Sequence, residues 1–333
     1  MKFNRETLAI YFAYLIAIVL SIIYVLWSID YVIRYTQGGS YRSEINKIIN
    51  DPNFKKKIEV KNKSTELLNT ELCDLYINSS HNSYTLTTQH LSYIYPKRIY
   101  EVLEAGCRVI EIDVKYLDGK FYVCHGNTSI WSTNKFPLEY ALDQVLKFSY
   151  TTSDPIFIMF EISVPQDNRP ALAKIIKDKL SVKFLDDKYK FKNNAEYGFD
   201  KDGDYSYAYK PNASYIHNLK LVDVLNKIII MNVTSPRNLE DVLDMYWLEN
   251  TESSRPIIKR LAGYNTFKRS YPTPTLATIY SYNVDPTIWW ENGYNMVAMN
   301  IQGNDYYQYL NTVKFKDSSF VPIPKYVDPN IKK

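Results

Sequence analysis

Short and almost wholly apolar runs recur along this chain and alternate with segments of helical spacing. Residues 156–162, 227–233 and 295–301 are such runs, and 138–148 and 169–180 are two of the amphipathic segments between them. Strands with few polar residues are buried on both faces, which is typical of a parallel sheet covered by helices. The pattern therefore predicts an α/β fold.

Side chains with acid–base or metal-binding chemistry follow the predicted strands where each strand ends. His81 comes after the expected strand 74–79, Glu111 and Asp113 lie late in 107–114, and His125 closes 121–125. Functional residues at the carboxyl ends of strands are typical of a TIM-type (β/α) barrel. No Gly-rich nucleotide fingerprint follows any expected strand, which disfavours a doubly wound sheet.

These side chains indicate metal-assisted chemistry at an anionic centre. Imidazole, as in His81 and His125, transfers protons near neutral pH. Glu111 and Asp113 are two residues apart on one strand and therefore share a face. Glu161 interrupts the apolar run Ile-Phe-Ile-Met-Phe-Glu-Ile, where a carboxylate is costly unless it is paired or binds a cation.

Each of these residues also has a purely structural interpretation. His81 would cap a loop, and His125 would be a hydrogen-bonded core histidine. Glu111 and Asp113 would pair with Arg108 and Lys115 nearby. The convergence of all of them at strand ends favours a joint site.

An uncharged apolar segment, residues 7–29, stands near the start of the chain. As a helix it would be roughly 34 Å long, against a bilayer core of ~30 Å. We therefore predict a single N-terminal transmembrane helix within residues 1–35, in preference to a cleaved signal peptide, because no small-x-small cleavage pattern follows. The flanking basic residues favour a cytoplasmic catalytic region: Lys2 and Arg5 precede the segment, and Arg34, Arg42 and Lys47 follow it.

Charge and cysteine content narrow the class of protein. The net charge is +4, and no basic block is long enough to predict nucleic-acid binding. The basic cluster Lys55–Lys57 is either a contact with anionic lipid or a solvated linker face. Cys73, Cys107 and Cys124 are an odd number in apolar runs, as expected of buried thiols in a reducing compartment.

The chain divides into five predicted regions. Residues 1–35 form the membrane anchor and 36–67 a polar linker. Residues 68–185 form a first half-barrel, 186–215 a loop between the halves, and 216–325 a second half-barrel. The barrel is thus expected to be built from two half-barrels.

Two ordered sets of motifs resemble a known enzyme family, eukaryotic-type phosphoinositide-specific phospholipase C. The first set resembles its X region: Tyr76-Ile-Asn-Ser-Ser-His-Asn-Ser-Tyr84, Gly106-Cys-Arg-Val-Ile-Glu-Ile-Asp113, Val123-Cys-His-Gly-Asn-Thr128 and Phe160-Glu161. The second set resembles its Y region: Arg269-Ser-Tyr-Pro272, Ser281-Tyr-Asn-Val-Asp-Pro286, Trp290-Glu-Asn-Gly293 and Asn295-Met-Val-Ala-Met-Asn-Ile-Gln302. The resemblance covers about residues 70–320.

The resemblance implies a calcium-dependent lipid hydrolase on a TIM-type barrel. Asn82, Glu111, Asp113 and Glu161 match the family's Ca²⁺ ligands, and their oxygens suit a hard cation. The implied substrate is a phosphoinositide in a membrane, cleaved to diacylglycerol and an inositol phosphate. The motifs do not indicate which proteins, if any, the chain binds.

The resemblance also implies catalytic roles for three residues. His81 matches the histidine that stabilises the charged transition state, and His125 matches the general acid for the departing diacylglycerol oxygen. Glu111 matches the base that removes the proton from the inositol 2-hydroxyl.

In the second half, Arg269 matches a contact to a ring phosphate and Tyr271 a residue that packs on the inositol ring. Where the family often carries two lysines that hold ring phosphates, this chain has Met231 and Val233. We therefore expect a preference for phosphatidylinositol or a singly phosphorylated form. We also expect this chain to lack the family's accessory domains and the anchor to replace them.

Two other functions fit part of the pattern. A glycerophosphodiester phosphodiesterase would use Glu111, Asp113 and His125 in much the same way, although the context of His81 and the second-half motifs argue against it. A catalytically silent membrane protein that binds lipids is the other alternative, and the presence of both histidines and all the ligand positions disfavours it.

Overall fold

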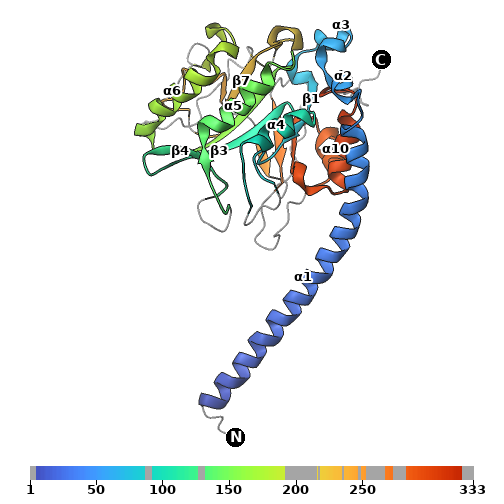
Figure 1. The fold of residues 1–333 in the computed structure, drawn as a ribbon, viewed down its shortest axis with the longest axis vertical. Helices are drawn as coiled ribbons and strands as arrows, with labels where there is room; N and C mark the ends of the chain where they lie inside the picture. Colours follow the sequence, from blue (N-terminus) through green and yellow to red (C-terminus); the bar gives the residue numbers. More distant parts are fainter. Residues whose placement is uncertain are drawn as a thin grey trace, which may run out of the picture.

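A long first helix, α1 (Arg5–Ile49), extends away from a body in which the other elements gather (Figure 1). The computed structural model describes residues 5–86, 92–126, 132–191, 216, 218–234, 236–246, 249–252, 267–272 and 283–324. Most of the predicted loop 186–215 therefore lies outside the described residues.

The body is built on a sheet whose central strands are parallel and follow one another around a curved path. Within the described residues the order is β8-β7-β6-β3-β2-β11-β10-β9, and β8 and β9 are not paired with each other. The path thus follows the order of a barrel that is open between its two halves. The strands are β2 (Ser79–Ser80), β3 (Val109–Leu117), β6 (Ile156–Ser163), β7 (Ile228–Asn232), β8 (Met245–Tyr246), β9 (Glu249–Glu252), β10 (Lys268–Tyr271) and β11 (Met296–Met299).

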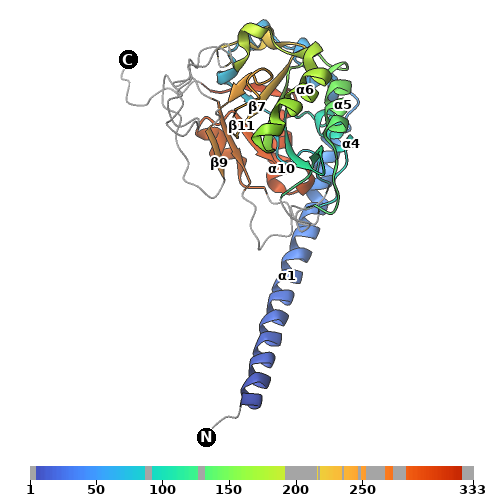
Figure 2. The same cartoon turned by 90° about the vertical axis from the view of Figure 1, so that its left-hand side faces the viewer.

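Helices cover the outside of these strands. Figure 2 shows α4, α5 and α6 together on one side of the sheet, with β9 on the other side. The helices are α4 (Lys97–Glu104), α5 (Leu138–Ser149), α6 (Arg169–Leu180), α9 (Pro286–Glu291) and α10 (Tyr306–Phe315). The α/β class and the strand–helix alternation predicted from the sequence are confirmed, and α6 has the predicted bounds.

The two faces of β7 show why its sequence is continuously apolar. Ile228 and Ile230 join the buried cluster formed with the covering helices. Ile229 and Met231 join a second cluster inside the curved sheet, which includes Val109 and other residues of the neighbouring strands. A strand buried on both faces has no position for a polar side chain until its end.

Smaller elements extend the sheet and close its base. β4 (Lys120–Val123) pairs antiparallel with β3 across Asp118 and Gly119, whose φ angles are 51° and 76°. Positive φ at both central residues is the condition for the two-residue hairpin turn that the Asp-Gly pair predicts. The remaining strands are β1 (Leu75–Ile77), β5 (Phe136–Pro137) and β12 (Phe320–Pro322).

The predicted polar linker 36–67 is not an extended connection in the structure. Helix α1 continues to Ile49, and α2 (Phe54–Ile58) and α3 (Thr65–Leu68) follow it. Ile45 is buried where α1 packs against α10, and Phe54 and Ile58 of α2 are buried beside Gly106. Scattered apolar residues in this polar segment therefore attach α1 to the body.

The predicted transmembrane helix is not borne out. Among the residues that the structure describes, none belongs to a helix that is both long enough and apolar enough to cross a bilayer. The uncharged segment instead forms the first part of α1, which continues into charged residues such as Arg42 and Glu44.

A buried ion pair fixes the start of β3 to the loop before β6. Arg108 Nε donates to Asp154 Oδ2 at 2.8 Å, and the Val60 backbone N–H donates to Asp154 Oδ1 at 2.8 Å. Arg108 and Asp154 are 1% and 2% exposed. Removing one partner of such a pair leaves an uncompensated buried charge.

We expect Asp154→Ala to lower the free energy of unfolding by roughly 3–5 kcal/mol, measured by urea denaturation. Asp143→Ala is the matched control, because Asp143 pairs with Lys179 at the surface, where such pairs contribute about 0–1 kcal/mol. Equal effects of the two substitutions would contradict the role assigned to Arg108 and Asp154.

Candidate functional site

Three carboxylates lie on one face of the neighbouring strands β3 and β6, and the outermost of them, Glu161, is exposed. Asp113 is paired in register with Glu161, and Glu111 precedes Asp113 by two residues. Val109 and Phe157, further back on the same strands, belong to the apolar interior. Because alternate residues of a strand share a face, the carboxylates lie above this apolar layer.

His81 lies beside this group at the end of β2. Its Nδ1 is 2.8 Å from Asn300 Oδ1, and its Nε2 is 3.6 Å from Glu111 Oε2. Burial lowers the pKa of His81, and the nearby Glu111 charge opposes that shift. Glu111 therefore favours the imidazolium form in a place where burial disfavours it.

Asn300 was not predicted as a site residue, although it lies near the end of the expected strand 295–301 and within one of the family motifs. The Asn300 backbone N–H donates to Asn283 Oδ1 at 2.6 Å, and Asn283 Nδ2 donates to the Asn300 carbonyl at 3.1 Å. Both asparagines are buried. They fix the position of Asn300 and, through it, of the His81 ring.

Asn82 connects the carboxylates to the second histidine. Its backbone N–H donates to Glu111 Oε2 at 3.0 Å, and its side-chain amide lies 3.2 Å from His125 Nε2. The Tyr84 hydroxyl donates to Asn82 Oδ1 at 3.2 Å. The two histidines and the four predicted metal ligands thus gather at one end of the sheet.

Burial and mutual repulsion raise the pKa of two of the carboxylates, whereas cationic and hydrogen-bond partners lower the pKa of the third. Burial, with the charges of Glu161 and Glu111, raises the pKa of Asp113 well above its usual range. Loss of water, with the charge of Glu111, also raises the pKa of Glu161. Burial opposes ionisation of Glu111, but Arg269, His81 and the Asn82 N–H outweigh it and keep the pKa of Glu111 low.

The donor set fits a hard divalent cation. Asp113 Oδ1 is buried without a hydrogen-bond partner, and carboxylate and amide oxygens are the ligands that Ca²⁺ prefers. The carboxylates are not drawn tightly together, however. Among the described residues, one set of potential metal ligands has its ligand atoms all within 4.8 Å of one another. That set is Glu71, Cys73 and Asp74, which lie elsewhere in the fold.

Arg269 binds one of the three carboxylates. Arg269 is fully buried, and its Nη2 is 2.9 Å from Glu111 Oε1. Its guanidinium carbon lies 5.1 Å from the centre of the Tyr271 ring, and that ring is 5.7 Å from the His81 ring. Both predicted substrate-binding residues therefore line the carboxylate group.

Next to His125 the surface is hollowed into a basic cavity of about 690 Å³. Lys115 and Lys135 are among its lining residues, with Ser163 at the end of β6. Positive charge in a pocket of this size favours an anionic small molecule. The cavity gives His125 access to a ligand from outside the sheet.

The chain matches two models of one family. Residues 68–201 match the X domain of phosphatidylinositol-specific phospholipase C, and residues 243–325 match its Y domain. The chain belongs to the phosphatidylinositol-specific phospholipase C family. The family resemblance recognised in the sequence motifs is thereby confirmed.

Individual relatives match over short segments. The 1-phosphatidylinositol 4,5-bisphosphate phosphodiesterase 1 of Saccharomyces cerevisiae is 32% identical over 125 residues, which are 37% of this chain and 14% of the yeast protein. The eta-1 phosphodiesterase of Mus musculus is 32% identical over 121 residues, 34% of this chain and 7% of that protein. The matched part is thus a small fraction of each relative.

Solved structures support the fold over more of the chain. The PLC21 crystal structure from L. pealei has a TM-score of 0.62 and 17% identity, and covers 79% of this chain and 38% of the other. PLC21 from S. officinalis has a TM-score of 0.59 and 18% identity over the same shares. The parallel sheet thus has the architecture of a TIM-like barrel split into two halves.

We expect Asp113→Asn to raise the melting temperature, by on the order of 2 °C, when divalent ions are chelated. The raised pKa of Asp113 means that its charge is disfavoured in the folded state, and asparagine removes that charge at the same size. Thermal denaturation in a chelator measures the effect, with Asp167→Asn as control because Asp167 is exposed. A lower melting temperature for Asp113→Asn alone would contradict this electrostatic picture.

Proposed function

We propose that this chain is a calcium-dependent phosphoinositide phospholipase C that cleaves its lipid to diacylglycerol and an inositol phosphate. The observation that carries the proposal is the position of His81 and His125 on either side of Asn82 and Glu111. Asn82, Glu111, Asp113 and Glu161 would hold the Ca²⁺. Bound calcium would lower the pKa of the inositol 2-hydroxyl and offset charge on the phosphoryl oxygens.

The protein's own side chains supply the proton transfers. Glu111, kept ionised by Arg269, removes the proton from the 2-hydroxyl as that oxygen attacks phosphorus. His125 donates a proton to the departing diacylglycerol oxygen, which leaves a cyclic phosphodiester. His81, held by Asn300, hydrogen-bonds the phosphoryl oxygens as negative charge develops on them.

We expect His125→Ala to reduce turnover by roughly 10²–10⁴-fold, because the departing oxygen would have no proton donor. Turnover of phosphatidylinositol is the measurement, and an unchanged melting temperature and Ca²⁺ affinity are the controls. Full activity of the variant would reject the assigned role, and inactivity of the wild-type chain would favour a silent lipid-binding protein.

The side chains on the inner surface of β7 favour a headgroup with few ring phosphates. Met231 is buried in the apolar interior, and Val233 packs against the same cluster. Neither side chain offers charge or a hydrogen bond to a ring phosphate. A headgroup with several ring phosphates would therefore lack partners along this strand.

We expect turnover of phosphatidylinositol, or of a singly phosphorylated form, to match or exceed turnover of the bisphosphate. An assay on defined lipids in one type of micelle measures the preference. Met231→Lys, which adds a cation on this strand, should shift the preference toward phosphorylated lipids. A wild-type preference of tenfold or more for the bisphosphate would refute the proposal.

The first part of α1 supports contact with a lipid surface. The large apolar side chains between Ile10 and Val25 are 44–66% exposed. Contiguous exposed apolar surface of this kind marks an interaction site. We propose that a membrane surface covers it and so holds the catalytic body at its substrate.

The direction of α1 is consistent with this role. Tyr41 packs on Tyr306 and Tyr309 near the start of α10, whereas Ile49 lies near Phe315 at its end. Because α10 begins a few residues after Asn300, its start lies at the catalytic edge of the sheet. The exposed part of α1 therefore extends beyond the same edge as the catalytic residues.

We expect a chain without residues 1–35 to keep its activity on micelles and to lose roughly 10-fold or more on vesicles, because tethering raises the local concentration of enzyme. Leu15→Glu should act in the same direction. Val182→Glu is the matched control, because Val182 is 66% exposed and lies after α6. Equal retention of activity on micelles and vesicles would contradict membrane attachment through α1.

A further inference from the structure

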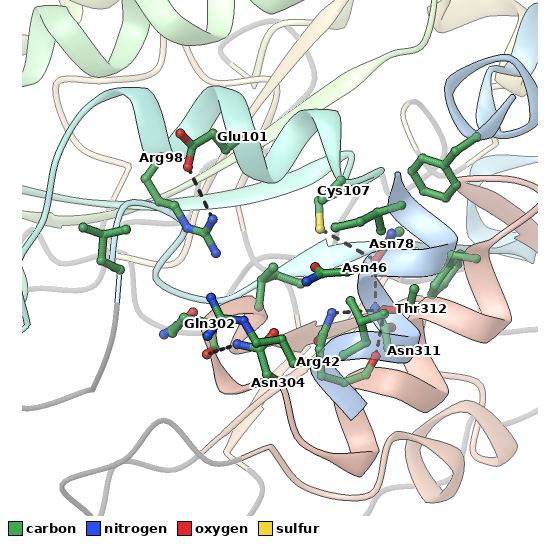
Figure 3. A pocket seen from close by; sticks show the side chains of 18 residues that line it. Arg42, Asn46, Asn78, Arg98, Glu101, Cys107, Gln302, Asn304, Asn311 and Thr312 are labelled. Atoms are coloured by element: carbon green, nitrogen blue, oxygen red, sulfur yellow. Dashed lines mark hydrogen bonds and ion pairs between the residues drawn. The ribbon is translucent and has the colours of Figure 1, made fainter. Parts of the chain in front are cut away.

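A second cavity, separate from the catalytic residues, lies where α1, α4 and α10 meet (Figure 3). Its volume is about 330 Å³, within the range of small-molecule sites. Arg42 and Asn46 reach it from α1, Arg98 and Glu101 from α4, and Gln308 and Asn311 from α10. Three segments far apart in the sequence thus build one polar chamber.

The wall of this cavity carries buried polar atoms that have no hydrogen-bond partner. They are Arg98 Nε, Gln308 Oε1 and Asn311 Oδ1. Gln308 is 4% exposed and Asn311 is 1% exposed. Buried polar atoms in folded proteins are nearly always hydrogen-bonded, so their concentration on one cavity indicates a ligand.

The protein's own contacts use only the other ends of these side chains. Asn311 Nδ2 donates to Asn78 Oδ1 at 3.0 Å, which turns the Asn311 oxygen away from that partner. Gln308 Nε2 lies 3.5 Å from Thr312 Oγ1. Two acceptor oxygens are thereby left for hydroxyl donors of a ligand.

The charges around the cavity favour an anion. Arg42 and Arg98 are its two cationic lining residues, and Glu101 is its acidic one. Glu101 lies 3.5 Å from Arg98 Nη1 and 3.6 Å from Lys97 Nζ outside the cavity, so one carboxylate faces two guanidinium groups. The guanidinium groups therefore give the cavity a net positive charge.

Part of the cavity wall is apolar. Phe54, Ile301 and Phe315 line it, and such side chains pack well against the C–H face of a saturated ring. A ligand for this chamber therefore combines hydroxyl groups, a ring and one anionic group.

We propose that this cavity binds a small polyhydroxylated phosphate ester, such as a sugar or cyclitol phosphate. Its hydroxyls donate to Gln308 Oε1 and Asn311 Oδ1, and its phosphate accepts from Arg98 and Arg42. Gln302 and Asn304, also on the wall, closely follow Asn300, which contacts His81. The ligand thus touches the segment that leads from the His81 partner into α10.

Isothermal titration of the full chain in chelator, without lipid substrate, tests the proposal. The probes are myo-inositol 1-phosphate, myo-inositol and inorganic phosphate. We expect saturable binding of the ester, and affinities at least roughly 10-fold lower for the other two, because each offers only part of the contacts. No saturable binding of the ester, or equal affinity for inorganic phosphate, would overturn the proposal.

Variants locate the binding in this cavity. The affinity for the ester should fall by roughly 10-fold or more in each of three variants, Gln308→Leu, Arg98→Ala and Arg42→Ala. Arg42 is exposed, so its replacement tests the site even if Gln308→Leu does not fold. Lys47→Ala is the charge-matched control on α1, since Lys47 pairs with Glu44 at the surface, and it should have no effect.

The variant Arg269→Ala distinguishes binding in this cavity from binding at the catalytic residues. Affinity for the ester should survive this substitution, because Arg269 does not line the cavity. Loss in Arg269→Ala with retention in Gln308→Leu would place the ligand at the catalytic residues and reject the second site. The measurement needs no turnover, so its outcome is independent of the phospholipase proposal.

Discussion

The ion pair between Arg269 and Glu111 is the interaction on which the catalytic end of the molecule depends. It joins β10 of the second half to β3 of the first, at 2.9 Å and with both side chains buried. Glu111 also contacts His81 and the Asn82 backbone. The Glu111 carboxylate thus connects both halves of the sheet to His81 and, through Asn82, to His125. Its ionised state depends on Arg269, which is more than a hundred positions away in the sequence.

The rest of the fold places these charged side chains between an apolar interior and the open end of the sheet. Below them, Val109, Phe157 and Ile229 fill the interior of the sheet with apolar side chains, which exclude water from that side. Above them, the strands end and the site opens near His125. Burial and repulsion disfavour negative charge on Asp113 and Glu161, and a divalent cation bound beside them would offset that cost.

The sequence predicted the parts of this arrangement that depend on local pattern. The apolar runs of β3 and β6 predicted buried strands, and the two-residue spacing of Glu111 and Asp113 predicted that they share a face. The ordered motifs identified the family. The contacts of Arg269 and Asn300 could not be predicted in the same way, because they depend on which strands become neighbours. The same holds for α1, whose path through the expected linker is set by burial of Ile45 against α10.

Turnover of phosphatidylinositol with and without a calcium chelator, with the products identified, tests the proposed mechanism most directly. We expect the chelator to abolish turnover, added Ca²⁺ to restore it, and the products to be diacylglycerol and cyclic inositol phosphate. Turnover that is unaffected by the chelator, or release of free glycerol phosphate, would contradict the mechanism.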